Sequence, residues 1–108
     1  GEVLHIDRFG NLITSIGRLD WTAPDTLWLE PEFGQNQRGL ALSARLCQIA
    51  IGGRQIIAVQ PTYSAVPPGT LVALVGSSGQ LEIAVNQGSA AESLHVSAGD
   101  SVIVTSSD

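Results

Sequence analysis

The chain has 108 residues, 44% of them hydrophobic, which suits one domain with one compact core. No apolar run approaches the roughly 20 residues that cross a bilayer, so we expect a soluble protein. Ten acidic residues stand against five arginines and no lysine, and the resulting net charge of -5 disfavours nucleic acid as a partner.

Short apolar runs follow one another along the chain, separated by Gly, Pro, Asn and Ser. This pattern is typical of an all-β fold, and we expect a small closed or partly closed Greek-key-like β-barrel. The polar, glycine-bearing stretch 31–39 is expected to be a loop. The predicted strands cover residues 2–7, 12–16, 26–30, 41–51, 55–60, 70–76, 80–86 and 101–106.

Three junctions between these runs have sequences that favour turns. Gly52 and Gly53 separate two apolar runs and take positive φ easily, which predicts a tight hairpin. The stretch VPPG at 66–69 ends a segment, because proline offers no ladder donor. GSSG at 76–79 separates LVALV from LEIAV and predicts a second hairpin.

One short helix is expected near residues 89–94. Ser89 and Glu92 have the spacing of a capping box, in which the serine accepts a backbone hydrogen bond and the glutamate reaches back.

Several kinds of reactive site are disfavoured by the sequence. His5 and His95 are far apart and Cys47 is the only cysteine, so no metal site is expected. No GxSxG nucleophile elbow occurs, and GSSG lacks the lysine and long helix of a phosphate-binding loop. A lone cysteine in an apolar stretch suits a packed thiol in a reducing compartment, and we expect the cytoplasm.

The stretch DRFGN at 7–11 has two interpretations. Asp7 and Asn11 beside a glycine are typical of a turn, with the Phe9 ring packed inward. The same stretch offers an aromatic face, an amide and a carboxylate, which are the groups that recognise a purine ring and an ammonium group.

Two blocks of this chain carry a family resemblance: IDRFGNLITSI and TYSAVPPGTLVALVGSSGQLEIAVNQGSAAE. They resemble the C-terminal domain of the S-adenosyl-L-methionine (SAM) hydroxide adenosyltransferases, or SAM hydrolases, which are relatives of SAM-dependent fluorinating and chlorinating enzymes. The resemblance implies hydrolysis of SAM to adenosine and L-methionine by water attacking ribose C5'. It implies no cofactor, since SAM is the substrate.

The resemblance also implies that this domain is part of a larger enzyme. In the family an N-terminal α/β domain activates water, and the site lies between neighbouring subunits of a homotrimer. The chain has no methionine and begins at Gly1 inside a predicted strand, which also favours a fragment. We therefore expect residues 1–108 to be a single C-terminal domain that is inactive alone, with no catalytic residue of its own.

For the adenine end of the substrate, the resemblance assigns residues from three segments. Asn11 matches an asparagine whose amide pairs with the adenine edge, and Phe9 matches the aromatic residue beside it. Tyr63 stands where halogenating relatives place a ring against adenine. The backbone near Gln87, just after Asn86, matches a stretch that hydrogen-bonds adenine.

For the methionine end, the resemblance assigns Asp7 to the ammonium group and Ser77, beside Ser78, to the carboxylate. Ser78 and Val85 stand where halogenating relatives carry arginines, so two cationic groups are missing. The Ser-Ser pair favours water over halide as the nucleophile.

Other functions stay open at this stage. The chain is alternatively a stand-alone β-barrel interaction module, or the C-terminal domain of a SAM-dependent halogenase. An oligonucleotide-binding barrel is disfavoured by the five aromatic residues and the acidic charge.

Overall fold

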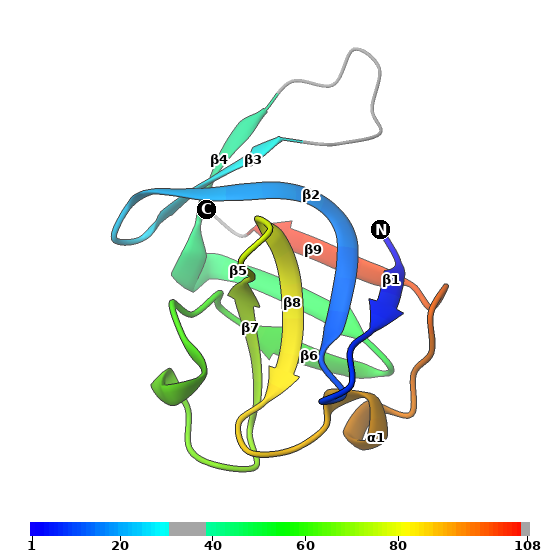
Figure 1. Cartoon of the computed structure of the whole chain (residues 1–108). Helices are drawn as coiled ribbons and strands as arrows, with labels where there is room; N and C mark the ends of the chain where they lie inside the picture. Colours follow the sequence, from blue (N-terminus) through cyan, green and yellow to red (C-terminus); the bar gives the residue numbers. More distant parts are fainter. Residues whose placement is uncertain (31–38, 107–108) are drawn as a thin grey trace.

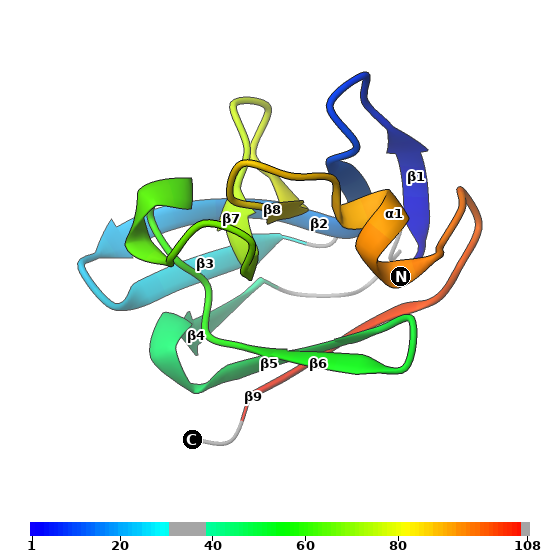
Figure 2. The ribbon, with the colours of Figure 1, turned by 90° about the horizontal axis from the view of Figure 1, so that it is seen from below.

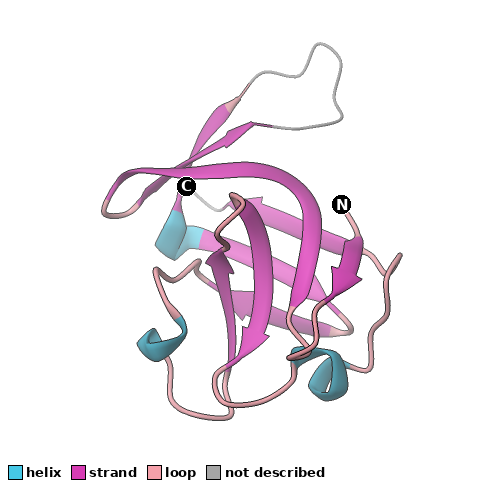
Figure 3. Ribbon diagram, viewed as in Figure 1, coloured by secondary structure: helices cyan, strands magenta, loops and turns pink. Residues whose placement is uncertain are grey.

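The computed structural model describes residues 1–30 and 39–106, which form two antiparallel sheets (Figures 1 and 3). The larger sheet has the order β4-β3-β2-β8-β7, with β1 added alongside β2, and the smaller has the order β6-β5-β9. The all-β class is confirmed. The larger sheet comprises β1 (Val3–Ile6), β2 (Leu12–Ala23), β3 (Thr26–Glu30), β4 (Leu40–Ser43), β7 (Leu71–Val75) and β8 (Gln80–Val85). The smaller sheet comprises β5 (Cys47–Ile51), β6 (Arg54–Ile57) and β9 (Val102–Ser106).

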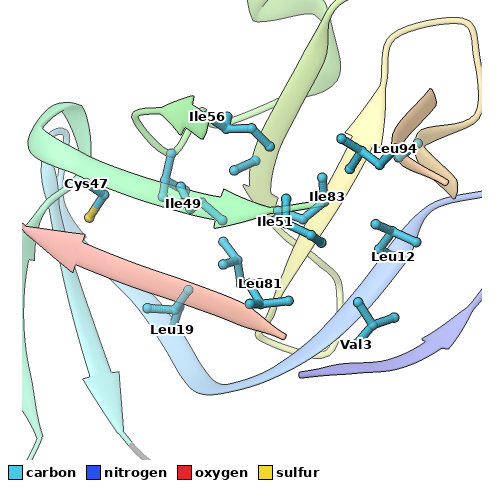
Figure 4. Close-up of a cluster of buried hydrophobic side chains, with 14 of the residues drawn as sticks. Val3, Leu12, Leu19, Cys47, Ile49, Ile51, Ile56, Leu81, Ile83 and Leu94 are labelled. Carbon is cyan, nitrogen blue, oxygen red and sulfur yellow. The ribbon is translucent and has the colours of Figure 1, made fainter. Parts of the chain in front are cut away.

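The hydrophobic core lies between the sheets. Figure 2 shows β2, β7 and β8 in one layer and β5, β6 and β9 in the other. Figure 4 shows buried side chains of both sheets meeting in this space, and Leu12, Ile49 and Ile83 are 0% exposed. Full burial of such a side chain contributes about 1.5–3 kcal/mol, so these contacts hold the two layers together. Cys47 is buried at the edge of the same cluster, as expected for a packed thiol.

Strand β2 is longer than the predicted 12–16 and runs on to Ala23. The prediction ended before Gly17, which the structure keeps inside the strand with φ 132°. A residue with a side chain rarely adopts this φ. The register of β2 against β8 shifts between Ile13 and Arg18, so β2 bends here and passes from β8 to β3.

The predicted strand 41–51 is wrong as a single element. The chain leaves β4, makes a 3-10 turn at Ala44–Leu46 and enters β5 in the other sheet. Asp25 holds this corner, because its carboxylate accepts hydrogen bonds from Ser43 Oγ at 2.6 Å and from the Arg45 N–H at 3.0 Å.

The described strands do not close into a barrel. Strands β6 and β7 lie at the edges of different sheets, and no ladder joins them in the part of the chain that the structure describes. Between them, Ala58 has φ 75° and ends the extended run, and a 3-10 turn follows at Tyr63–Ala65. The prolines of this connection also offer no ladder donor. Of the two predicted forms, closed and partly closed, the closed one is therefore wrong.

The locally encoded turns are confirmed. Gly52 and Gly53 have φ 57° and 75° in the β5–β6 hairpin, and GSSG joins β7 to β8. Helix α1 (Ala90–Leu94) begins after Ser89, whose Oγ accepts the Glu92 N–H at 3.2 Å. The other bond of the predicted capping box, from the Glu92 side chain back to the main chain, is not formed in the described residues. The predicted loop 31–39 lies outside the described residues except for its last position.

Candidate functional site

The DRFGN stretch forms the turn between β1 and β2. The carboxylate of Asp7 accepts hydrogen bonds at Oδ1 from the N–H of Phe9 at 2.9 Å and of Asn11 at 3.0 Å. Gly10 has φ 83° and lies against Ser89, where an added β-carbon would overlap the Ser89 side chain. The Gly10 carbonyl accepts the Ala91 N–H at 3.0 Å. The turn interpretation is confirmed, and the turn is fixed to the start of α1.

Asp7 and Asn11 also bond to each other through their side chains. Asn11 Nδ2 donates to Asp7 Oδ2 at 3.1 Å, and Asn11 is 9% exposed. Desolvation acts to raise the pKa of Asp7, but the hydrogen bonds from Asn11 and Phe9, together with nearby His5, outweigh it and lower the pKa. Asp7 is therefore a carboxylate at neutral pH. Among the described residues, Asn11 Oδ1 and the second amide hydrogen have no partner, so both are available to a ligand.

The ring of Phe9 faces solvent, so the expected inward packing is wrong. Phe9 is 64% exposed, and the Arg8 guanidinium carbon lies 4.9 Å from the ring centre. The Asp7 carboxylate bonds back to the N–H groups of Phe9 and Asn11, and the Phe9 side chain is left outside the core. An exposed cation–π contact of this kind contributes about 0.5–1 kcal/mol.

A shallow pocket of about 480 Å³ lies at the end of the larger sheet where β1 joins β2 and β8 leads to α1 (bottom in Figure 1). Among the predicted site residues, the structure brings together those that the resemblance assigns to adenine. The pocket is lined by Phe9, Asn11, Tyr63, Val85, Asn86, Gln87 and Gly88.

The segment after β8 forms one wall of this pocket. Asn86 Nδ2 donates to the Val66 carbonyl at 2.8 Å, so this side chain ties the wall to the connection before β7. Gln87 has φ 59°, a conformation that non-glycine residues rarely adopt. No hydrogen bond of the Gln87 main chain is formed within residues 1–30 and 39–106, so its N–H and C=O are available at the rim.

Tyr63 completes the pocket from the 3-10 turn between β6 and β7. It is 39% exposed, and desolvation, with the charges of Glu82 and Asp7, raises its pKa. The tyrosine is therefore neutral, with a hydroxyl that donates and accepts. Together, Phe9 and Tyr63 offer two aromatic faces beside the Asn11 amide, a combination suited to a flat heterocycle.

Sequence reasoning missed Glu82. This residue lies on β8 between Ile13 and Leu74, which are 7% and 6% exposed. Its carboxylate packs against Gly76, where any β-carbon would overlap it. Desolvation and the charge of Asp7 raise the pKa of Glu82, while His5 acts in the opposite direction.

The Glu82 carboxylate forms no hydrogen bond or ion pair with a residue in the described part of the chain. A partly desolvated carboxylate without a partner attracts a cationic ligand. The signal in the sequence was a lone charge inside the buried run LEIAV.

Ser77 and Ser78 are not in the first pocket. They lie in the β7–β8 hairpin, at the opposite end of β8, where a second hollow of about 450 Å³ includes both serines. The six residues of β8 span about 17 Å at about 3.4 Å per residue. Glu82 lies between the two ends, so a ligand that uses both must extend along β8.

Other kinds of site are not found in the described ranges. No group of three or more His, Cys, Asp or Glu residues there is arranged to hold a metal ion. Within those ranges, no helix is both long and apolar enough to cross a membrane.

The fold and the site define an all-β domain that carries a pocket beside the β1–β2 turn. Residues 1–103 match the model of the SAM hydroxide adenosyltransferase C-terminal domain. The chain belongs to this family.

The chain is also similar to one protein of known activity and to two solved structures. The chain is 39% identical over 99 residues to an (R)-S-adenosyl-L-methionine hydrolase of Thermus thermophilus, covering 92% of the chain and 29% of that protein. A solved structure of a conserved hypothetical protein from Thermus thermophilus matches with 33% identity and a TM-score of 0.65, over 97% of the chain and 32% of the other. A conserved protein from Thermotoga maritima matches with 28% identity and the same TM-score of 0.65, over 96% and 34%. The chain thus spans about a third of the length of these relatives.

Proposed function

We propose that this chain is the substrate-binding C-terminal domain of an enzyme that hydrolyses SAM to adenosine and L-methionine. The observation that carries the proposal is the pocket that Phe9, Asn11 and Tyr63 form in a chain of this family. The pocket suits a purine ring, because it combines two aromatic faces with an amide that still has a donor and an acceptor.

In this proposal, the adenine ring lies between Phe9 and Tyr63, and its edge pairs with Asn11 and with the main chain at Gln87. Asn86 acts indirectly, because its amide is engaged with the Val66 carbonyl. Its role is to hold the wall that presents Gln87.

The cationic part of SAM extends from this pocket along β8. Oδ2 of Asp7 accepts one hydrogen bond in the turn and has a further lone pair for the ammonium group. Glu82 lies nearby and faces the same region, so it adds a second carboxylate for the positively charged portion of the substrate. The ammonium and carboxylate groups of methionine share one carbon atom, so Ser77 and Ser78 bind the carboxylate beside Glu82, whose own carboxylate lies against Gly76 next to Ser77.

The reaction needs a water molecule and a neutral leaving group. Water attacks ribose C5', methionine leaves with its sulfur as a neutral thioether, and one proton is released. Residues of this chain contribute by fixing both ends of SAM and excluding water from the rest of it, with SAM as substrate and no cofactor. We assign the activation of water to another domain of the same protein, and we infer that the 108-residue chain is inactive alone. We also infer a cytoplasmic homotrimer in which neighbouring subunits share each site.

The test uses the full-length gene product that contains these residues. Calorimetric titration with SAM should show Asn11→Ala binding about 5- to 150-fold more weakly, which corresponds to about 1–3 kcal/mol for an unpaired adenine edge. Gln55→Ala is a matched control, because the Gln55 amide bonds to Gln48 on the smaller sheet, outside this pocket. Equal SAM affinity of wild type and Asn11→Ala would contradict the role of Asn11.

The product distinguishes the remaining alternatives. Formation of a 5'-halo-5'-deoxyadenosine in the presence of halide would identify a SAM-dependent halogenase. Absence of both SAM binding and turnover in the full-length protein would favour an interaction module.

A further inference from the structure

Arg18 lies beside the GSSG hairpin although it comes from a distant part of the chain. It follows Gly17 in β2, where its backbone pairs with Gln80, and the next N–H donates to the Gly79 carbonyl at 2.7 Å. The Arg18 side chain runs across Gly79, where an added β-carbon would lie 3.2 Å from Cγ and 3.7 Å from Nε. The bend of β2 at Gly17 therefore brings a guanidinium to the tip of the β7–β8 hairpin.

Arg18 and the two serines share one hollow, of about 450 Å³. Ser78 Oγ donates to Gln80 Oε1 at 3.1 Å, whereas Ser77 Oγ makes no hydrogen bond with any residue the structure describes. The N–H groups of Ser77 and Ser78 also have no protein partner in those ranges. The hollow thus combines a guanidinium, a hydroxyl and backbone donors, which are the groups that bind a carboxylate.

We propose that Arg18 binds the α-carboxylate of the methionine moiety of SAM, together with Ser77, and selects substrates that carry this carboxylate. The inference rests on the proposed function. The charges beside this hollow, those of Asp20 and Glu82, are negative, so a cation is needed to hold an anionic group there. Ser78 and Val85 do not provide one, because neither side chain is charged.

The Arg18 guanidinium can exchange its ion-pair partner Asp20 for a ligand. Arg18 Nε lies 3.6 Å from Asp20 Oδ2, and the two side chains are 66% and 54% exposed. Exposed ion pairs contribute little net stability, so replacing Asp20 with a ligand carboxylate loses little free energy. The planar guanidinium also matches a carboxylate with two parallel hydrogen bonds, which the single ammonium group of lysine does not provide.

The experiment compares SAM with decarboxylated SAM, which keeps the sulfonium and ammonium groups but lacks the carboxylate. Steady-state kinetics are measured on the full-length gene product and its Arg18→Gln variant. For SAM, Arg18→Gln should raise KM by about 10-fold or more, the factor for one lost charge-assisted hydrogen bond, with kcat little changed. For decarboxylated SAM, wild type and Arg18→Gln should have the same KM.

Two further variants separate binding from folding. Arg54→Gln removes an exposed arginine at the β5–β6 hairpin and should leave both KM values unchanged. Arg18→Lys keeps the charge without the planar fork and should give a KM for SAM between those of wild type and Arg18→Gln. Circular dichroism spectra of all variants should overlay.

Each outcome bears on a different claim. Equal losses on the two substrates, or no loss on SAM, would overturn the assignment of Arg18 while leaving the proposed function standing. A wild-type protein that neither binds nor hydrolyses SAM would overturn the proposed function and this inference with it.

Discussion

Replacing Asp7 by alanine should destabilise the domain, because one carboxylate organises the β1–β2 turn. It accepts hydrogen bonds of 2.9 Å from Phe9 N, 3.0 Å from Asn11 N and 3.1 Å from Asn11 Nδ2. A hydrogen bond to a charged group contributes about 1.5–3 kcal/mol when shielded from water. Because this turn is half-exposed, about 1 kcal/mol for each bond is the better estimate. Asp7→Ala should therefore lower the free energy of unfolding by about 2–3 kcal/mol.

Urea and thermal denaturation of the 108-residue chain measure this loss. A domain of this size loses about 4–8 °C in Tm per kcal/mol, so Asp7→Ala should melt about 10 °C or more below wild type. Asp7→Asn keeps Oδ1 for the two backbone donors but places an amide opposite Asn11 Nδ2. It should lose about 1 kcal/mol, less than the alanine variant.

The pH dependence provides an independent check. The folded-state pKa of Asp7 is lowered, so its stabilisation is present above the ordinary aspartate value of about 3.9 and is lost as pH falls through the lowered value. The difference in free energy of unfolding between wild type and Asp7→Ala should therefore become smaller in acid. A gap below about 0.5 kcal/mol at neutral pH, or equal losses for Asp7→Ala and Asp7→Asn, would refute the reasoning.

Two further predictions concern Gly10 and Glu82. Gly10→Ala should lower the free energy of unfolding by about 2 kcal/mol or more, because it combines positive φ with overlap on Ser89. Gly53→Ala, which has open space, should lower it by about 1 kcal/mol. Equal losses in urea denaturation would contradict the contact with Ser89. The folded-state pKa of Glu82 is raised, so stability is lost as pH rises from the ordinary glutamate value through the raised one. Glu82→Gln should therefore be more stable than wild type at pH 7 and as stable as wild type below about pH 4. A variant less stable than wild type at pH 7 would refute the upward direction of the Glu82 pKa shift.

Features encoded by neighbouring residues were predictable from the sequence. The Gly52-Gly53 hairpin, the GSSG hairpin and the Ser89 cap all form as expected, because each depends on φ preferences or on one short-range hydrogen bond. The DRFGN turn belongs to the same class.

Features encoded by distant residues were not predictable in the same way. The run 41–51 is mostly apolar, and the residue that holds its corner, Asp25, precedes Ser43 by 18 positions. Similarly, a glycine weakens the interior of a strand, but here β8 and β3 pair with β2 on either side of Gly17.

The pocket was only partly accessible to sequence reasoning. The positions of Tyr63 and Phe9 in the sequence do not indicate that both line one pocket, and the expectation that they share a site came from the resemblance. Strand alternation places Glu82 on the face opposite Leu81 and Ile83, but it does not tell what else lies there. The position of Arg18 beside the β7–β8 hairpin was not predictable for the same reason, since the bend of β2 decides which hairpin it contacts.

The most direct test of the central claim is to incubate the full-length gene product with SAM in water enriched in oxygen-18. The account predicts adenosine labelled at its 5'-hydroxyl and unlabelled L-methionine, because water attacks ribose C5' and the thioether leaves. Absence of adenosine, or adenosine without the label, would contradict the account.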